Sequence, residues 1–163
     1  MAWSTAHWRR VAEAMDARSA LDSRSSISAL ARLISHLARA GGFTIDPRNG
    51  MAPSFSRRDF VVSLAGREAV YRIAPRAAEV GAWLSKVKSA LEPPSRFVGG
   101  WMSDLSGLYY LDVSTVVRGL ECALTLAASY GQQAIFHPTS GRTIYLHEDH
   151  VGGRSDCAQQ DGA

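Results

Sequence analysis

Helical periodicity dominates the first forty residues. Apolar side chains recur at the i, i+3, i+4, i+7 spacing of one helix face in two stretches, separated by the polar residues 21–26. The apolar positions are Trp8, Val11, Ala12 and Met15 in the first stretch, and Ile27, Leu30, Ala31, Ile34, Leu37 and Ala38 in the second. The pattern predicts helices over residues 5–20 and 26–40, the second ended by Gly41 and Gly42. Together they predict a helical hairpin whose two members must each bury an apolar stripe.

The period changes to that of strands after residue 42. Short runs rich in β-branched and aromatic residues, bounded by turn residues, predict strands. They lie at residues 43–45, 59–65, 97–102, 108–117, 132–137 and 142–147, with an extended stretch at 69–74. Helical spacing returns after Pro75 and again over residues 120–130. The apolar side of the helix after Pro75 consists of Val80, Trp83, Leu84, Val87 and Leu91.

These elements predict an α+β fold, with an N-terminal helical hairpin followed by a mainly antiparallel sheet and two further helices. We place the hairpin at residues 1–40, the α+β domain at 41–151, and a polar tail that we expect to be disordered at 152–163. Gly99 and Gly100 fall inside a predicted strand, which indicates a bulge or a close backbone approach.

Composition narrows the class of protein. The chain has 163 residues, 46% apolar and 20% charged, as expected for one globular domain. No apolar run reaches the 18 or so residues of a membrane span, and charges interrupt the N-terminus where a signal peptide needs an apolar stretch. We therefore expect a cytoplasmic protein without membrane contact. The spacing of Cys122 and Cys157 does not predict a disulfide framework.

Charge is unevenly spread. Residues 1–60 carry nine arginines and five acids, while residues 61–163 carry nine basic and ten acidic residues. The first third is therefore net +4 and the rest net −1, for the total of +3. An arginine-biased segment can face nucleic acid or an acidic protein, provided that the arginines share one face.

The stretch HPTSGRTIYLHEDHV near the C-terminus raises the question of a metal or acid/base site. It contains His137, His147 and His150 beside Glu148 and Asp149. A metal site needs three or four ligands held by an ordered frame. The His147 to His150 pair straddles a predicted strand end and a predicted tail, so we expect no metal here. A small enzyme or metal-binding protein using this end stays a second alternative.

Nucleophilic and nucleotide-binding motifs have little support. Ser114 and Asp112 alternate with apolar neighbours, as on the wet face of a half-buried strand, and Ser114 lacks a G-x-S-x-G elbow. Cys122 lies near the apolar side of its predicted helix, as a small buried residue would. Neither glycine pair has the context of a phosphate loop. We expect no catalytic residue and no cofactor.

Surface residues remain as the candidates for function. Arg57 and Arg58 lie between two phenylalanines, and Trp101, Tyr109 and Tyr110 fall on a predicted hairpin. Exposed aromatics beside arginine can stack on bases or anchor a protein contact. We therefore predict partner-binding residues in three groups. They are Trp8, Arg9, Arg10 and Met15 on the first helix, Arg57 and Arg58, and Trp101 and Tyr109.

Three segments, GGFTIDPRNG, GGWMSDLSGLYYLDVSTVV and YGQQAIFHPTSGRTIYL, resemble small proteins of actinobacterial phages, plasmids and neighbouring mobile elements. The resemblance covers residues 41–146 and rests on structural motifs. It implies a shared fold and a mobile-element setting, but no reaction and no functional residue. That setting favours accessory proteins that bind a host partner, including inhibitors of the anti-CRISPR kind.

The leading hypothesis is a non-enzymatic binding protein that contacts a protein or ribonucleoprotein, such as a host defence nuclease, or a second copy of itself. The alternative is a nucleic-acid-binding accessory protein that uses an arginine-rich face.

Overall fold

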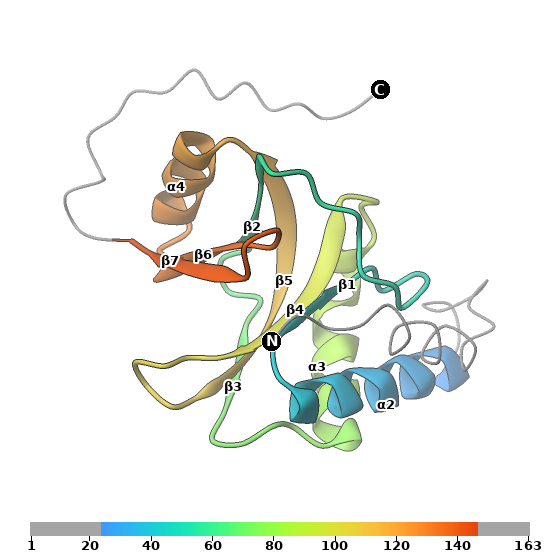
Figure 1. The fold of residues 1–163 in the computed structure, drawn as a ribbon. Coiled ribbons are helices and arrows are strands. Elements are labelled where there is room, and N and C mark those ends of the chain that lie inside the picture. Colours follow the sequence, from blue (N-terminus) through green and yellow to red (C-terminus); the bar gives the residue numbers. More distant parts are fainter. Residues whose placement is uncertain (1–23, 147–163) are drawn as a thin grey trace. The chain divides into compact units, whose positions relative to one another are not determined.

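The computed structural model describes residues 24–146 (Figure 1). The helices of this part are α2 (Arg24–Ala40), α3 (Ala77–Val87) and α4 (Leu120–Ser129), with the 3₁₀ turn η1 (Lys88–Leu91) after α3. Its strands are β1 (Phe43–Ile45), β2 (Asp59–Ser63), β3 (Ala69–Tyr71), β4 (Arg96–Met102), β5 (Tyr109–Arg118), β6 (Ala134–His137) and β7 (Arg142–Tyr145). The α+β class is confirmed. The first helix of the predicted hairpin lies outside the described residues.

The seven described strands follow the order β1-β4-β5-β2-β6-β7, with β3 paired to β5. The pairs β1 with β4, β3 with β5, β2 with β6 and β6 with β7 are all antiparallel, which confirms the mainly antiparallel sheet. The described chain divides into two compact units. Unit 1 comprises residues 24–54 and 66–114, and unit 2 comprises residues 55–65 and 115–146. The division at residues 40/41 and 151/152 stays a prediction.

Unit 1 contains the helices α2 and α3, which pack against each other. The buried side of α2 consists of Leu30, Ala31, Ile34, Leu37 and Ala38, as its periodicity predicts. All five apolar positions predicted for the helix after Pro75 are buried as well, in α3 and η1. The Ser35 hydroxyl donates to the Pro75 carbonyl at 2.8 Å, which ties α2 to the segment leading into α3. The second predicted helix is therefore part of the core of unit 1.

A close backbone approach holds β4 in place. Gly100 lies opposite Phe43 of β1. A Cβ atom at residue 100 would lie 2.6 Å from the Tyr109 hydroxyl oxygen and 2.8 Å from Cζ of Phe43, and one at Gly99 would lie 2.6 Å from Oδ1 of Asp112. These distances leave no room for a side chain, so the close approach predicted at the two glycines is confirmed.

The Tyr109 side chain fills the space beside Gly100. Tyr109 is 1% exposed, and its hydroxyl donates to the Gly41 carbonyl at 3.2 Å. Burial, and then the negative charge of Asp112, raise the pKa of the Tyr109 hydroxyl. The phenol therefore stays protonated and keeps its role as a donor.

Unit 2 has its own apolar cluster. Helix α4 packs against β2 and β6, and the buried members of this cluster are Phe60, Val62, Ala123, Ala127 and Ile135. Gly131 ends α4 with a φ of 64°, a left-handed conformation that glycine adopts without strain. The chain then enters β6, which forms a hairpin with β7. Among the described helices, none is long and apolar enough to cross a membrane.

Two glycine substitutions test the close approach. Gly100→Ala should lower the free energy of unfolding by about 1–3 kcal/mol, because the new methyl group overpacks Tyr109 and Phe43. Gly81→Ala on α3 is the matched control, since its Cβ would lie 3.8 Å from the nearest heavy atom, the Cβ of Ala31. This second change should raise stability by about 0.5–1 kcal/mol through helix propensity. Urea unfolding measures both, and equal effects at the two positions would contradict the packing described.

Candidate binding surfaces

An aromatic and aliphatic row crosses three strands of unit 1. Val70 of β3 lies directly opposite Tyr110 of β5, and the Tyr110 ring stacks on Trp101 of β4 with ring centroids 5.1 Å apart and planes at 20°. Residues directly opposite one another on paired strands share a face of the sheet, so the three side chains form one row. Val70 is 48% exposed, and both aromatic rings are half-buried.

Further apolar side chains lie exposed where the β4–β5 hairpin turns. Leu105 in the turn is 74% exposed, whereas Met102, 45% exposed at the end of β4, follows Trp101 and therefore points to the other face of the sheet. The antiparallel register carries the chain beyond Tyr71 towards this turn, and Ile73 beyond it is 75% exposed. We call the row together with the side chains of the turn the hairpin surface. Its members are Val70, Ile73, Trp101, Leu105 and Tyr110.

The structure corrects one of the predicted partner-binding residues. Trp101 lies on the hairpin surface, but Tyr109 is buried beside Gly100 and is not available to a partner. Successive residues of a strand face opposite sides, so Tyr110 takes the surface position instead. Leu105 was missed, although an apolar side chain inside the polar turn SDLSG is the kind of signal that marks an exposed contact residue.

Asp112 and Ser114 do not lie on a wet strand face, and that prediction was wrong. They are 5% and 0% exposed. They follow Tyr110 at alternate positions of β5, so this face becomes more buried along the strand. The Asp112 carboxylate fits the space left by Gly99. The Ser114 hydroxyl has no hydrogen-bond partner in the part of the chain that the structure describes.

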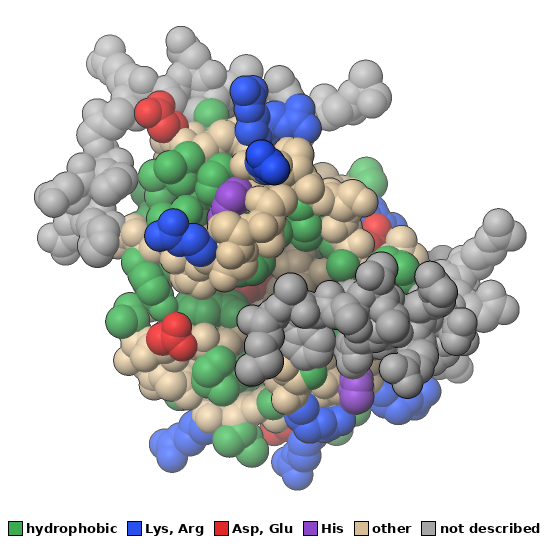
Figure 2. All heavy atoms as spheres, viewed as in Figure 1, with side chains coloured by type: hydrophobic (Ala, Val, Ile, Leu, Met, Phe, Trp, Pro, Cys, Tyr) green, Lys and Arg blue, Asp and Glu red, His purple; other side chains and the backbone are tan. Residues whose placement is uncertain are grey.

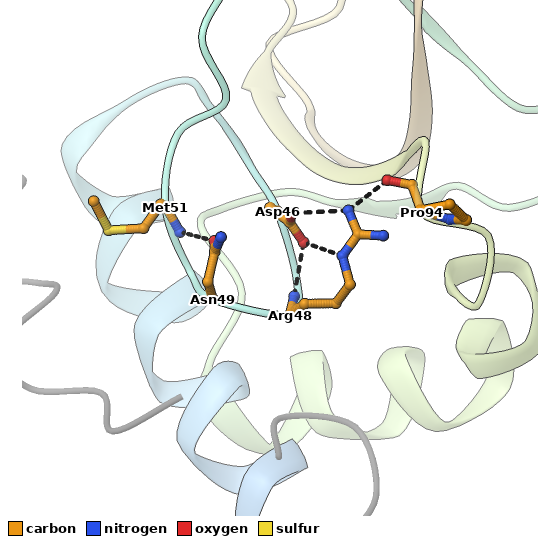
Figure 3. A network of polar contacts seen from close by, with 5 residues as sticks. All are labelled: Asp46, Arg48, Asn49, Met51 and Pro94. Carbon is orange, nitrogen blue, oxygen red and sulfur yellow. Dashed lines mark hydrogen bonds and ion pairs between the residues drawn. The ribbon is translucent and has the colours of Figure 1, made fainter. Parts of the chain in front are cut away.

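The turn DPRNG after β1 forms a structural network (Figure 3). Arg48 donates through Nε to Oδ1 of Asp46 at 2.8 Å and through a terminal nitrogen to Oδ2 at 2.7 Å. The same terminal nitrogen also donates to the carbonyl of Pro94. The Arg48 guanidinium thus links the turn after β1 to the segment before β4 within unit 1. Three of its five N–H donors are used within unit 1, so we assign this arginine to the fold and not to a partner.

Four arginines from separate segments come together in unit 2. The Gly119 N–H donates to the Arg58 carbonyl at 2.8 Å, which places Arg118 beside the Arg57 to Arg58 turn. His137 on β6 lies opposite Arg142 on β7, and its Nε2 lies 3.1 Å from the Arg57 carbonyl. We call these residues the arginine surface. Its members are Arg57, Arg58, Arg118, Arg142 and His137.

Basic side chains gather around a histidine on the face shown in Figure 2. All four arginines of the arginine surface are exposed. Arg57 and Arg58 were predicted as contact residues, whereas Arg118 and Arg142 were missed because only strand pairing brings them near. Of the described arginines in the first third, Arg57 and Arg58 belong to unit 2, whereas Arg32 and Arg48 belong to unit 1.

Asp59 neutralises one member of the arginine surface. Its carboxylate lies 3.6 Å from Nε of Arg118 and accepts the Ser56 N–H at 2.7 Å. Burial alone would raise the pKa of Asp59, but the Ser56 hydrogen bonds and the Arg118 charge together hold it below its ordinary value. Within residues 24–146, none of the other three arginines forms an ion pair.

His137 takes a structural place in this surface. Its ring stacks on Phe60 with centroids 4.8 Å apart, and Nδ1 lies 2.6 Å from the Ser140 hydroxyl oxygen. No three His, Cys, Asp or Glu side chains gather to hold a metal ion within the described residues. The other two members of the predicted histidine site, His147 and His150, lie outside that part of the chain.

Cys122, predicted as a small buried residue, is half-buried on α4. The predicted contact residues of the first helix, Trp8, Arg9, Arg10 and Met15, lie outside the described residues.

Comparison with protein families, curated proteins and solved structures finds no match to this chain. These comparisons therefore assign no function to the chain.

The buried hydroxyls of Ser114 and Ser35 in unit 1 should differ in their contribution to the free energy of unfolding. Ser114→Ala should leave stability unchanged or raise it slightly, because the hydroxyl is buried without a partner. Ser35→Ala is the matched comparison. It should cost about 1 kcal/mol, because the bond to the Pro75 carbonyl is lost. Urea unfolding measures both, and a loss at Ser114 as large as that at Ser35 would show that Ser114 has a partner.

Proposed function

We propose that the protein is a non-enzymatic binding protein that docks a partner protein, or the protein part of a ribonucleoprotein, on the hairpin surface. The observation that carries the proposal is the row from exposed Val70 through half-buried Tyr110 and Trp101, with the exposed side chains of Ile73 and Leu105 towards the turn. Apolar side chains gathered at a protein surface commonly mark an interaction site.

The chemistry of the row suits a protein interface. Tryptophan and tyrosine are the residues most enriched at interface hot spots. The Trp101–Tyr110 stack is already formed in the free chain, so binding immobilises few additional rotamers there. Leu105 and Ile73 are the most exposed large apolar side chains of the described residues, and covering them removes apolar area from water.

The neighbouring backbone supports the same function. Among the described strands, β3 has β5 as its single neighbour. An edge strand beside an apolar row can receive an added strand of a partner, with backbone hydrogen bonds for affinity and side-chain contacts for specificity.

We place this binding protein in a mobile genetic element, as an inhibitor of a host defence ribonucleoprotein or nuclease of the anti-CRISPR kind. The setting is the one that we expect from the sequence motifs of residues 41–146. A small protein can inhibit a nuclease or ribonucleoprotein simply by covering one of its contact surfaces. The apolar and aromatic side chains of the hairpin surface are suited to such a contact.

Site-specific photo-crosslinking tests the proposal. Benzoylphenylalanine at Leu105 should capture a discrete host protein from lysate, with nuclease treatment distinguishing a protein from a ribonucleoprotein. The same probe at Ala82, an exposed position of α3, is the control and should not capture it. Val70→Lys, a change at an exposed position, should weaken capture from Leu105 about tenfold without lowering the thermal midpoint. Equal capture from both positions, or capture unaffected by Val70→Lys, contradicts the proposal.

A further inference from the structure

The arginine surface is a second exposed region, and its chemistry differs from that of the hairpin surface. The described part of unit 2 contains four arginines but only two acids, Asp59 and Glu121. Asp59 is 8% exposed and is engaged by Arg118 and Ser56. The remaining guanidinium groups, those of Arg57, Arg58 and Arg142, keep donors that face solvent. Arginine presents a planar fork that matches phosphate oxygens in bidentate fashion.

An exposed aromatic ring lies beside these arginines. Phe136 on β6 is 36% exposed and lies opposite Val61 of β2. Asp59 precedes Val61 by two residues and therefore shares its face of the sheet. Because Asp59 holds the Arg118 guanidinium at 3.6 Å, the Phe136 ring and Arg118 lie on the same face.

The side chain of the next residue of β6 lies on the opposite face of the sheet. His137 follows Phe136, so it points to the other side of the sheet together with its partner Arg142. A ligand that crosses the end of β6 would therefore meet a cation and an aromatic ring on one face, and a second cation on the other.

We propose that the arginine surface binds single-stranded nucleic acid, with the arginines on successive phosphates and a base stacked on Phe136. This surface is separate from the hairpin surface and does not depend on the proposed protein contact. Positive charge along the backbone path combined with an aromatic platform is the arrangement by which proteins bind single strands without sequence preference.

Two features favour a single strand over the other polyanions. A flexible strand can bend around the end of β6 and reach both faces, whereas a rigid duplex presents its phosphates along a straight axis. An acidic protein would satisfy the arginines, but it would cover Phe136 only if an aromatic side chain lay beside its carboxylates, whereas every nucleotide carries a base beside its phosphate. RNA and DNA share the required chemistry, so oligonucleotides of both kinds are the probes.

Fluorescence anisotropy with labelled oligo-dT and oligo-U of about 20 nucleotides tests the proposal. Contacts of Arg57, Arg58 and Arg142 to three phosphates predict a slope of about −2.1 in log affinity against log salt, hence roughly 20-fold weaker binding at about 200 mM than at about 50 mM salt. The double change Arg57→Ser with Arg142→Ser should reduce this slope to about a third. Arg32→Ser with Arg72→Ser removes the same charge from exposed positions of unit 1 and should leave the slope unchanged.

Substitutions at Phe136 separate stacking from charge. Phe136→Leu should weaken binding about fivefold or more with an unaltered salt slope, because the ring is lost and the arginines remain. Phe136→Tyr keeps the ring and should retain the affinity. Val70→Lys on the hairpin surface should have no effect on oligonucleotide binding.

Several results would overturn the proposal. These are the absence of binding to either oligonucleotide at about 50 mM salt, equal loss in the two double-arginine variants, and equal affinity for a duplex of the same length. Competition by polyglutamate as effective as that by unlabelled oligonucleotide would assign the surface to an acidic protein and would also contradict it.

Discussion

The close approach of Tyr109, Phe43 and Gly100 is the constraint on which the hairpin surface depends. Because residue 100 has no side chain, the Tyr109 hydroxyl reaches the Gly41 carbonyl beneath β4. The next residue along β4, Trp101, then points to the opposite face and stacks on Tyr110. The buried contact at Gly100, which tolerates little added volume, thus fixes the positions of the Trp101 and Tyr110 rings on the other face of the sheet.

Most of the helices and strands could be predicted from the local periodicity of apolar residues. The five apolar positions predicted after Pro75 are all buried, because helical periodicity depends on residues near one another in the sequence. The paired glycines mark a close backbone approach, although the side chains they face, Phe43, Tyr109 and Asp112, come from other segments. The strand runs were also placed within a few residues of β2, β4 and β5. Each of these elements has a pattern that only one kind of secondary structure explains.

The errors arose where the pattern was ambiguous or the contact was distant. Alternation along β5 separates Tyr109 from Tyr110, but it does not say which of the two faces is exposed, so Tyr109 was assigned to the surface. The same alternation placed Asp112 and Ser114 in water, whereas both are buried. Only Arg57 and Arg58 of the arginine surface could be predicted from the sequence, because Arg118 and Arg142 join them through the pairing of β2, β6 and β7 and the contact of Gly119 with Arg58.

The two surfaces belong to different units, and we propose that they recognise different chemistry. Hydrogen–deuterium exchange of the whole chain, alone and with saturating oligo-dT, tests this division most directly. Added protection is expected in peptides that cover residues 57–58 and 137–142, with no change in peptides that cover residues 101–110. Protection centred on residues 101–110, or no change in any peptide, would contradict the division.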